Sequence, residues 1–368
     1  MIRIPVYQPY LNGNEKKYIN ECIDTNWISS KGKYVQEFEQ DFAEYIGSKY
    51  ATTVCNGTVA LHLALLALDI KPNDEIIVPT FTYIASVNAI TYMGATPIFV
   101  DSDLKTWQIS TEDVKKKITN KTKAIMTVHL YGYPCDMIKI NEIAKQYNLF
   151  VIEDCSESLG SKLNGQHLGT FGDIATFSFF GNKTITTGEG GMVTTNNRKL
   201  YELSCKLKSQ GLHGGDRQYW HDVVGYNYRM TNMCAAIGKA QLEKIDDILE
   251  RKKVIADFYI QNLNRLPFDL LPQYEFVDNS YWMFTALIKQ PYSRNDLMKY
   301  LADNGIETRP TFYPAHQMPM YFKDEYYFPI AEQIGYRGIN FPSYPSISEE
   351  ELKYIIDKVS SFFDLYKF

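Results

Sequence analysis

Short apolar runs alternate with helical patterns between residues 51 and 197 of the chain. The runs predict buried strands, and they lie at residues 75–78, 96–101, 124–130, 149–154, 175–179 and 191–195. Strands that alternate with helices are typical of an α/β fold, in which helices flank a largely parallel sheet. Because ligands of such sheets gather at the carboxyl ends of the strands, we expect chemistry at Asp154 and in the loops after Val78, Leu130 and Phe179.

The C-terminal part of the chain has a different pattern. The predicted elements are a long connecting helix over residues 232–262, a strand at 281–288, and helices that begin after Ser293 and Ser348. Both serines stand at the start of a capping-box pattern. These elements predict a small α+β domain, so we divide the chain into a large domain (residues 1–245) and a small C-terminal domain (residues 246–368).

Composition and charge narrow the class of protein. The chain of 368 residues has a net charge of −5, which argues against a nucleic-acid or anionic-membrane partner. Its six cysteines are widely scattered and read as reduced thiols, and its six histidines have no close metal-ligand spacing. No apolar stretch approaches the ~20 residues of a membrane helix. We therefore expect a cytoplasmic protein that has no metal and binds neither nucleic acid nor membrane.

Lys183 stands in a loop of small and hydroxyl residues directly after a predicted strand. Four glycines between Gly181 and Gly191 allow a bound group to approach the backbone closely, and Ser178 with the neighbouring threonines supplies hydroxyls. The spacing is not that of a phosphate-binding Walker loop. The alternative interpretation is an ordinary solvated lysine.

Asp154 ends the apolar run at residues 149–154, where an unpaired buried charge would be costly. One hypothesis is that it pairs with the protonated ring nitrogen of a pyridine cofactor, and the alternative is that it caps the next helix. Gly57 and Thr58 precede a helical pattern, whose N-terminus suits a phosphate but equally suits simple capping. Tyr83 follows a strand and is interpreted either as a ring that stacks on a ligand or as a core residue.

Several motifs occur in the order found in the DegT/DnrJ/EryC1/StrS family of sugar aminotransferases, which the chain resembles from Pro5 to near its C-terminus. The matching segments are residues 25–30, 56–58, 79–86, 152–157, 177–191, 225–232 and 307–316. The resemblance implies the fold-type I architecture of enzymes that use pyridoxal 5'-phosphate (PLP). That architecture has a mostly parallel seven-stranded sheet, a smaller C-terminal α+β domain, and a homodimer with active sites at the interface.

The resemblance also implies roles for individual residues. Lys183 matches the lysine that holds the cofactor, Asp154 the partner of the ring nitrogen, and Tyr83 the ring-stacking position. Gly57, Thr58 and Ser178 match the phosphate site, and Asn227 matches a residue that reaches the phosphate from the other subunit. Glu157 falls where the family often has glutamine or histidine near the phenolic oxygen. The candidate residues on the substrate side are Ser29, Arg309, Tyr313 and His316, for which a loop that packs two domains together is the alternative interpretation.

The implied reaction is a transamination in which L-glutamate donates the amino group and pyridoxamine phosphate is the intermediate form of the cofactor. The implied acceptor is a nucleotide-linked 4-keto-6-deoxyhexose aminated at C4, with GDP as the preferred nucleotide and UDP or dTDP as alternatives. A 3-aminotransferase and a non-catalytic PLP-binding protein are further alternatives. The family's sugar 3-dehydratases have histidine in place of the lysine, so Lys183 disfavours dehydration.

Overall fold

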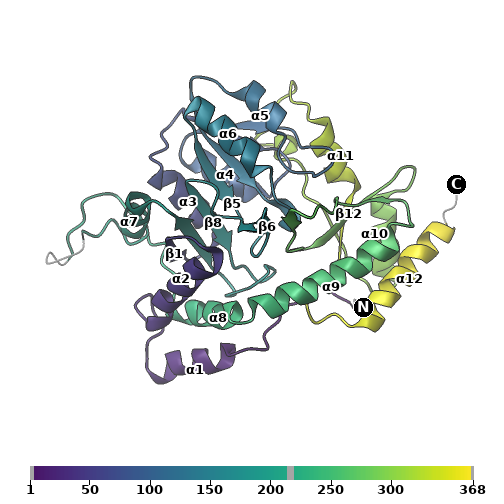
Figure 1. Cartoon of the computed structure of the whole chain (residues 1–368), viewed down its shortest axis with the longest axis horizontal. Coiled ribbons are helices and arrows are strands. Elements are labelled where there is room, and N and C mark those ends of the chain that lie inside the picture. The colour runs from purple at the N-terminus through teal and green to yellow at the C-terminus, as the bar shows by residue number, and fades with distance from the viewer. Residues whose placement is uncertain (1–3, 214–218, 366–368) are drawn as a thin grey trace.

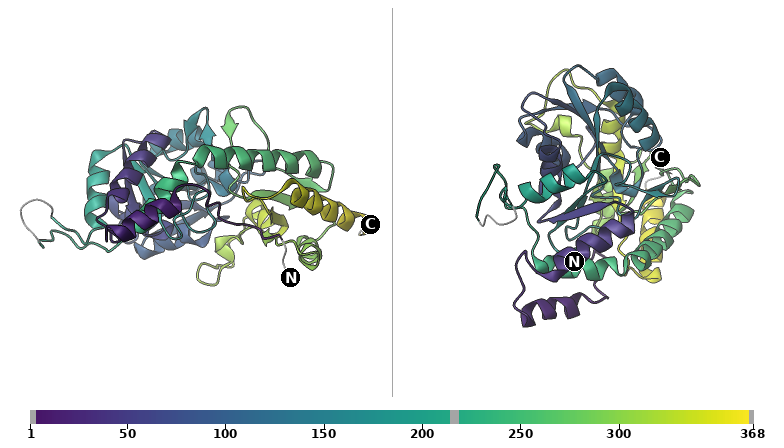
Figure 2. Two further views of the ribbon diagram at one scale, coloured as in Figure 1. Left: turned by 90° about the horizontal axis from the view of Figure 1, so that it is seen from below. Right: turned by 60° about the vertical axis from the view of Figure 1, so that its left-hand side comes forward.

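The computed structural model describes residues 4–213 and 219–365. Figures 1 and 2 show two layered regions joined by one long helix, and the C-terminus lies at the end farther from the large sheet. Among the described residues, no helix is both long and apolar enough to span a membrane.

The large sheet contains the six strands predicted from the N-terminal half and one more. Its strands are β1 (Tyr50–Val54), β2 (Glu75–Pro79), β3 (Thr96–Val100), β4 (Thr122–Val128), β5 (Phe150–Asp154), β8 (Ile174–Ser178) and β9 (Gly191–Thr195). They are ordered β1-β9-β8-β5-β4-β2-β3, and only β9 runs antiparallel to both neighbours. The seven-stranded, mostly parallel sheet is thus confirmed. The prediction missed β1, whose Ala-Thr-Thr centre has little apolar character although it is buried.

Helices cover both faces of this sheet. They are α1 (Glu15–Asp24), α2 (Lys33–Ile46), α3 (Gly57–Ala67), α4 (Ile84–Tyr92), α5 (Thr111–Lys117), α6 (Met137–Tyr147), α7 (Arg198–Leu207) and α8 (Asn232–Leu242). Helices α3 and α4 share one apolar core with alternate strand residues such as Ile152. Helices α2, α6 and α8 share the opposite core with residues such as Val151. The two-residue period of a strand thus places neighbours on β5 against different helices.

The long connecting helix predicted over residues 232–262 is interrupted. Helix α8 ends at Leu242, Lys244 leaves the helical conformation, and α9 (Ile245–Leu263) begins immediately afterwards. The prediction of one continuous helix was wrong because the apolar stripe continues across the break. The two helices contact different cores: Ala235 of α8 packs under the large sheet, and Tyr259 of α9 packs in the C-terminal core.

The C-terminal region is built on a second sheet, ordered β10-β12-β14-β13. Its elements are β10 (Phe268–Asp269), β12 (Phe284–Ile288), α10 (Arg294–Asp303), β13 (Arg309–Pro310), α11 (Pro329–Arg337), β14 (Gly338–Phe341) and α12 (Glu349–Leu365). A three-stranded sheet of β11 (Val277–Asp278), β6 (Lys162–Leu163) and β7 (Gln166–His167) joins the two regions. The predicted α+β character is confirmed, whereas the domain division at residue 245 stays a prediction.

The predicted starts of α10 and α12 are confirmed by their caps. The Ser293 hydroxyl accepts a hydrogen bond from the Asp296 N–H. At α12 the capping box is complete: the Ser348 hydroxyl accepts from the Glu351 N–H at 3.1 Å, and the Glu351 carboxylate accepts from the Ser348 N–H at 2.9 Å. The helix so fixed buries Leu352, Ile355, Val359, Phe362 and Phe363.

We predict that Ser348→Ala lowers the free energy of unfolding by about 0.5–2 kcal/mol, because the first turn of α12 loses its cap. Urea unfolding measures this loss. Ser361→Ala, which changes a serine inside the same helix, serves as the control and should cost less. Equal losses in the two variants would contradict a role for the capping box.

Candidate active site

Side chains from four strand ends meet at the carboxyl edge of the large sheet, as the alternating pattern predicts. Ser86 follows β2, Tyr131 follows β4 in a short 3₁₀ turn (Leu130–Gly132), Glu157 follows β5, and Lys183 follows β8. Ser86 contacts Asp154 at the end of β5, and Tyr131 and Lys183 each contact Glu157. The loops expected to carry chemistry are therefore adjacent in space.

Lys183 is largely shielded from water. Its Nζ lies 3.9 Å from the centroid of the Trp282 ring and 4.0 Å from the Glu157 carboxylate, and 14% of its side chain is exposed. The solvated-loop interpretation is thus wrong for this lysine. An amine in this position has an aromatic face on one side and a carboxylate on another.

Burial changes the protonation of both partners. Loss of water contact lowers the pKa of Lys183 below its ordinary value, although the negative charges of Glu157 and Asp154 oppose this shift. Burial likewise raises the pKa of Glu157 to about 7, opposed by the charge of Lys183. Burial outweighs attraction because the two groups are 4.0 Å apart and both lie inside the protein. Burial therefore favours the neutral amine of Lys183, the form that can accept a proton, more than in a solvated lysine.

The lysine and the glutamate belong to a closed ring of contacts. Glu157 accepts a hydrogen bond from the Tyr131 N–H at 2.9 Å, and the Tyr131 ring stacks on Trp282 at 6.0 Å and 14°. Trp282 in turn lies under the Lys183 amine. Tyr131 has a left-handed backbone (φ 56°), which is uncommon for an aromatic residue and turns its N–H toward the carboxylate.

Asp154 is buried at the end of β5 and is oriented by two donors. The Ser86 hydroxyl donates to one carboxylate oxygen at 2.7 Å, and the Ser156 N–H donates to the other at 3.0 Å. The bond from Ser156 closes a turn, and no helix follows β5 before α7, so the helix-capping interpretation is wrong. Each oxygen retains a lone pair for a further donor, and the carboxylate is close enough for its charge to act on Lys183.

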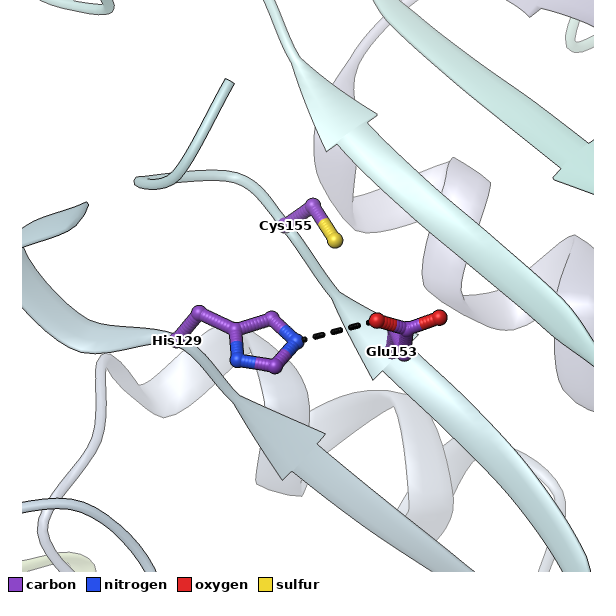
Figure 3. A group of neighbouring side chains, drawn as sticks. All are labelled: His129, Glu153 and Cys155. Atoms are coloured by element: carbon purple, nitrogen blue, oxygen red, sulfur yellow. Dashed lines mark hydrogen bonds and ion pairs between the residues drawn. The ribbon is translucent and has the colours of Figure 1, made fainter. Parts of the chain in front are cut away.

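Glu153 and Cys155 flank Asp154 and face the opposite side of the sheet, together with His129. Figure 3 shows the His129 ring pointing at the Glu153 carboxylate, at 3.2 Å, with the Cys155 thiol beside them. Within the described part of the chain, this is the one group of three metal-ligating side chains close enough to share an ion.

These groups already satisfy one another. The Cys135 N–H donates to Nδ1 of His129, and N–H groups of Gly169, Phe171 and Gly172 donate to Glu153. Burial also raises the pKa of the Cys155 thiol to about 12, so without a bound ion the thiol is protonated at neutral pH. The arrangement favours a structural network over a metal site, and the absence of a metal stays a prediction.

The N-terminus of α3 and the end of β8 form a close cradle. Asn56 caps the helix by accepting from the Val59 N–H at 3.0 Å. A Cβ atom at Gly57 would lie 2.7 Å from Cβ of Ser178, so the helix reaches this position only because residue 57 is glycine. The N–H groups of Gly57 and Thr58 belong to the first turn, which has no acceptors within the helix, and the Ser178 hydroxyl lies beside them. The geometry suits an anion such as a phosphate.

Tyr83 is exposed at the start of α4, which contradicts its interpretation as a core residue. Its ring is 57% exposed and lies 5.5 Å from the ring of Phe312. Phe312 stacks on Tyr131 at 5.7 Å and 18°, so Tyr83 stands at the outer end of an aromatic row that leads to Trp282 and Lys183.

The four substrate-side candidates divide into two groups. Ser29, Arg309 and Tyr313 are exposed, and Arg309 also forms a 3.4 Å ion pair with Glu307. His316 is buried, and its two ring nitrogens contact Thr80 at 2.7 Å and Glu332 at 3.2 Å. For His316 the geometry favours the alternative interpretation, in which it packs the loop against the large sheet.

Asn227 is exposed within this subunit, and its side-chain oxygen accepts from Arg229 at 3.1 Å. Among the described residues, its side chain bonds to Arg229 and not to Lys183, Asp154 or the cradle, so within one chain it is not joined to the site. Its expected contribution from a second subunit stays a prediction.

The sequence analysis did not identify Trp282, Tyr131 and Ser86 individually. Ser86 lies in the first turn of α4 and Tyr131 in a 3₁₀ turn, both shortly after strand ends where chemistry was expected. Their positions were thus indicated by the sequence, but their roles were not. Trp282 was placed inside a strand predicted over 281–288, but β12 begins only at Phe284. Tyr281 has φ 48°, and this turn before the strand directs Trp282 to the lysine.

Comparison with known proteins agrees with this geometry. The model of the DegT/DnrJ/EryC1/StrS aminotransferase family matches residues 9–360. The chain is 62% identical to GDP-perosamine synthase from Escherichia coli O157:H7, with 98% of each chain covered. It is 50% identical to GDP-perosamine synthase from Vibrio cholerae, over 98% of this chain and 99% of that protein.

A putative sugar aminotransferase from Streptococcus pneumoniae has a similar structure. Its PLP form superposes with a TM-score of 0.92 at 28% identity, covering 98% of this chain and 99% of the other. Its PMP form gives a TM-score of 0.93 at 27% identity, covering 99% and 100%. The family match spans nearly the whole chain and includes the Lys183 loop and Asp154. The chain therefore belongs to the DegT/DnrJ/EryC1/StrS aminotransferase family, whose members are PLP-dependent.

Proposed function

We propose that this protein transfers the amino group of L-glutamate to C4 of a GDP-linked 4-keto-6-deoxyhexose, giving the 4-amino-4,6-dideoxy sugar. The observation that carries the proposal is the Lys183 amine, which is shielded from water and lies between Trp282 and Glu157. The negative charge of Asp154 also acts on this amine. The identity of 62% to a GDP-perosamine synthase supports the choice of sugar and nucleotide.

The residues present fit PLP. The cradle at Gly57, Thr58 and Ser178 offers donors for the phosphate, because the missing Cβ of Gly57 lets the first-turn N–H groups of α3 lie beside the Ser178 hydroxyl. Asp154 retains acceptor capacity for a protonated ring nitrogen, and Lys183 provides the amine. Tyr83 is exposed beside this edge and provides a ring face. Glu157, with a pKa of about 7, can share a proton with a phenolic oxygen.

PLP, when bound, supplies the electron sink that stabilises negative charge at the carbon that loses its proton. The protein's own contribution is to move that proton. Lys183 serves as the base that takes the proton from the α-carbon of glutamate and later returns a proton to C4 of the sugar. Burial lowers the pKa of Lys183 and so raises the share of neutral amine above that of a solvated lysine, whose pKa is ~10.4.

The substrate side is proposed to use the exposed candidates Ser29, Arg309 and Tyr313. Arginine suits the diphosphate because its planar guanidinium binds two oxygens together, and the hydroxyls suit the sugar. We assign His316 a supporting role, since both ring nitrogens already have partners. Burial also lowers the pKa of His316, so it is neutral at physiological pH.

We further propose that two copies of the chain form a homodimer with shared sites. The arm formed by residues 208–213 and 219–231, between α7 and α8, extends away from the body, as the left side of Figure 1 shows. Some of its apolar side chains are exposed. Tyr219 is 89% exposed and Val224 is 87% exposed, and Asn227 lies at the base of the same arm. A second copy would cover these side chains.

The six free cysteines support a cytoplasmic location.

GDP is preferred over UDP or dTDP because both GDP-perosamine synthases compared above share at least half of their residues with this chain. A 3-aminotransferase would share the same lysine chemistry, and the regiochemistry of the product distinguishes the two. A non-catalytic PLP-binding protein is disfavoured because Lys183 and Asp154 are both present and lie in the same site. A dehydratase is disfavoured because residue 183 is lysine.

The first prediction for this function concerns the donor half-reaction. L-Glutamate should convert the visible absorbance of the PLP-loaded protein into the near-ultraviolet band of the amine form. In Lys183→Ala the conversion should slow by about 10²–10⁴-fold, because the proton-transfer group is missing. A wild-type protein that holds PLP but responds to no amino donor would refute the assignment.

The second prediction concerns the acceptor. Among GDP-, UDP- and dTDP-linked 4-keto-6-deoxyhexoses, the GDP sugar should restore the visible band fastest, and the product should carry nitrogen at C4. Stopped-flow absorbance and NMR of the product measure these two properties. Faster restoration by dTDP or UDP sugars would move the proposal to those substrates, and nitrogen at C3 would replace it by 3-amination.

The third prediction concerns the cradle. Gly57→Ala should weaken PLP binding by roughly 10- to 100-fold, because the added methyl group overpacks the contact with Ser178. Overpacking of this kind costs about 1–3 kcal/mol. Equilibrium dialysis of PLP measures the affinity. The control is the Ser178→Gly background, which removes the opposing Cβ, so Gly57→Ala should cost little there. The same loss in both backgrounds would mean that the contact with Ser178 is not the cause.

A further inference from the structure

The backbone on both sides of the Lys183 peptide is held by side chains from distant parts of the chain. The Tyr7 hydroxyl donates to the carbonyl oxygen of Lys183, across 176 residues. The Trp282 indole N–H donates to the carbonyl oxygen of Asn182 at 2.7 Å, across 100 residues. Two successive carbonyl groups are thus fixed by aromatic donors from the N-terminal segment and from the C-terminal region.

Tyr7 is itself anchored by the residues before it. Ile4 pairs with the C-terminal region through N–H to the Gly305 carbonyl at 3.0 Å and accepts from the Glu307 N–H at 2.9 Å. The Val6 N–H donates to the Glu307 carboxylate at 3.0 Å, and Ile4 and Val6 are both buried. The segment from Ile4 to Tyr7 therefore runs as a fixed strap from the C-terminal region to the lysine.

A second lysine contacts both Tyr7 and Trp282, the two residues that donate to the Lys183 loop. Lys252 on α9 is buried, and its Nζ donates to the carbonyls of Tyr281 and Trp282 at 3.2 and 3.1 Å and to that of Ser343 at 3.2 Å. The same amine lies 5.9 Å from the centroid of the Tyr7 ring. Tyr7 and Trp282 are thus held by a common buried group.

We propose that Tyr7 is a positioning residue for Lys183, fixing the lysine backbone so that only its side chain moves during proton transfer. The inference rests on the proposed function, because it assumes that Lys183 is the proton-transfer group. A lysine that must reach two different carbon atoms needs a mobile amine but a fixed point of attachment. Small displacements of such a group are costly to the rate. Burial raises the pKa of the Tyr7 hydroxyl, so the group remains a donor.

Tyr7→Phe keeps the ring and removes the hydroxyl. Tyr259→Phe is a matched control: it removes a buried hydroxyl that donates to the Pro342 carbonyl at 2.8 Å, a bond that does not involve the Lys183 loop. Both full-length variants are compared with wild type in two measurements. The first is the pH dependence of Lys183 acetylation in the cofactor-free protein, followed by peptide mass spectrometry. The second is the glutamate half-reaction of the PLP-loaded protein.

The acetylation midpoint is the pH at which Lys183 reacts at half its maximal rate. In Tyr7→Phe we expect this pH to rise toward that of an ordinary lysine, because the amine is less firmly held against Trp282. The charged groups that face this amine, Glu157 and Asp154, are unchanged in the variant. The maximal half-reaction rate should fall roughly 10-fold or more, with little change in the glutamate concentration at half-maximal rate. Tyr259→Phe should lose similar thermal stability but change neither measurement.

Equal effects of the two variants on Lys183, or no effect of Tyr7→Phe, would overturn the inference. If Tyr7→Phe does not fold, Glu307→Ala detaches the strap at Val6 while keeping Tyr7, and it should shift the acetylation midpoint in the same direction. An unchanged midpoint there would also overturn the inference. A wild-type protein inert to glutamate would refute the proposed function instead, since the acetylation comparison needs no turnover.

Discussion

The alternation of side chains at the end of β5 is the constraint on which the rest of the site depends. Asp154 points to the face covered by α4, where Ser86 orients it, whereas Glu153 and Cys155 point to the opposite face. Glu153 accepts N–H groups from residues 169–172, the segment that leads directly into β8 and hence to Lys183. One short strand end thus positions the site carboxylate directly and the lysine indirectly. A shift of one residue in register would exchange the two faces.

Lys183 and Glu157 are buried without enough hydrogen bonds or opposite charge to replace the water they lose. This shifts the pKa values of both groups. Taking an ammonium and a carboxylate out of water is unfavourable, and a contact at 4.0 Å repays only part of that cost. The protein holds Lys183 and Glu157 in place through backbone and aromatic contacts, so the remaining imbalance appears as shifted pKa values. The His129–Glu153 pair differs because four donors surround the carboxylate. A buried glutamate beside a basic side chain is therefore part of a structural network on one face, and on the other it is part of a pair with shifted pKa values.

The sequence was informative where function depends on local geometry. Asp154 and Ser178 end strands, Lys183 follows one, and Gly57 begins a helix. Short sequence motifs identify such positions. The sequence was less informative where partners are distant: Trp282 and Tyr7 reach the lysine across 100 and 176 residues, and no local pattern encodes those contacts. The break between α8 and α9 was missed because the apolar stripe continues across it. For His316 only the tertiary structure reveals that Thr80 and Glu332 occupy both nitrogens.

The aromatic row links the substrate-side loop to the amine. Phe312, Tyr131 and Trp282 stack at 5.7 and 6.0 Å with nearly parallel rings, and Trp282 ends the row beneath Lys183. The Tyr131 hydroxyl also accepts from the Phe312 N–H at 3.3 Å, which ties the loop backbone to the same row. Because packed rings resist displacement, the loop that carries Arg309 and Tyr313 cannot move far without moving the surface on which the amine rests. The proposed substrate-side residues and the surface that holds the amine thus belong to one packed unit.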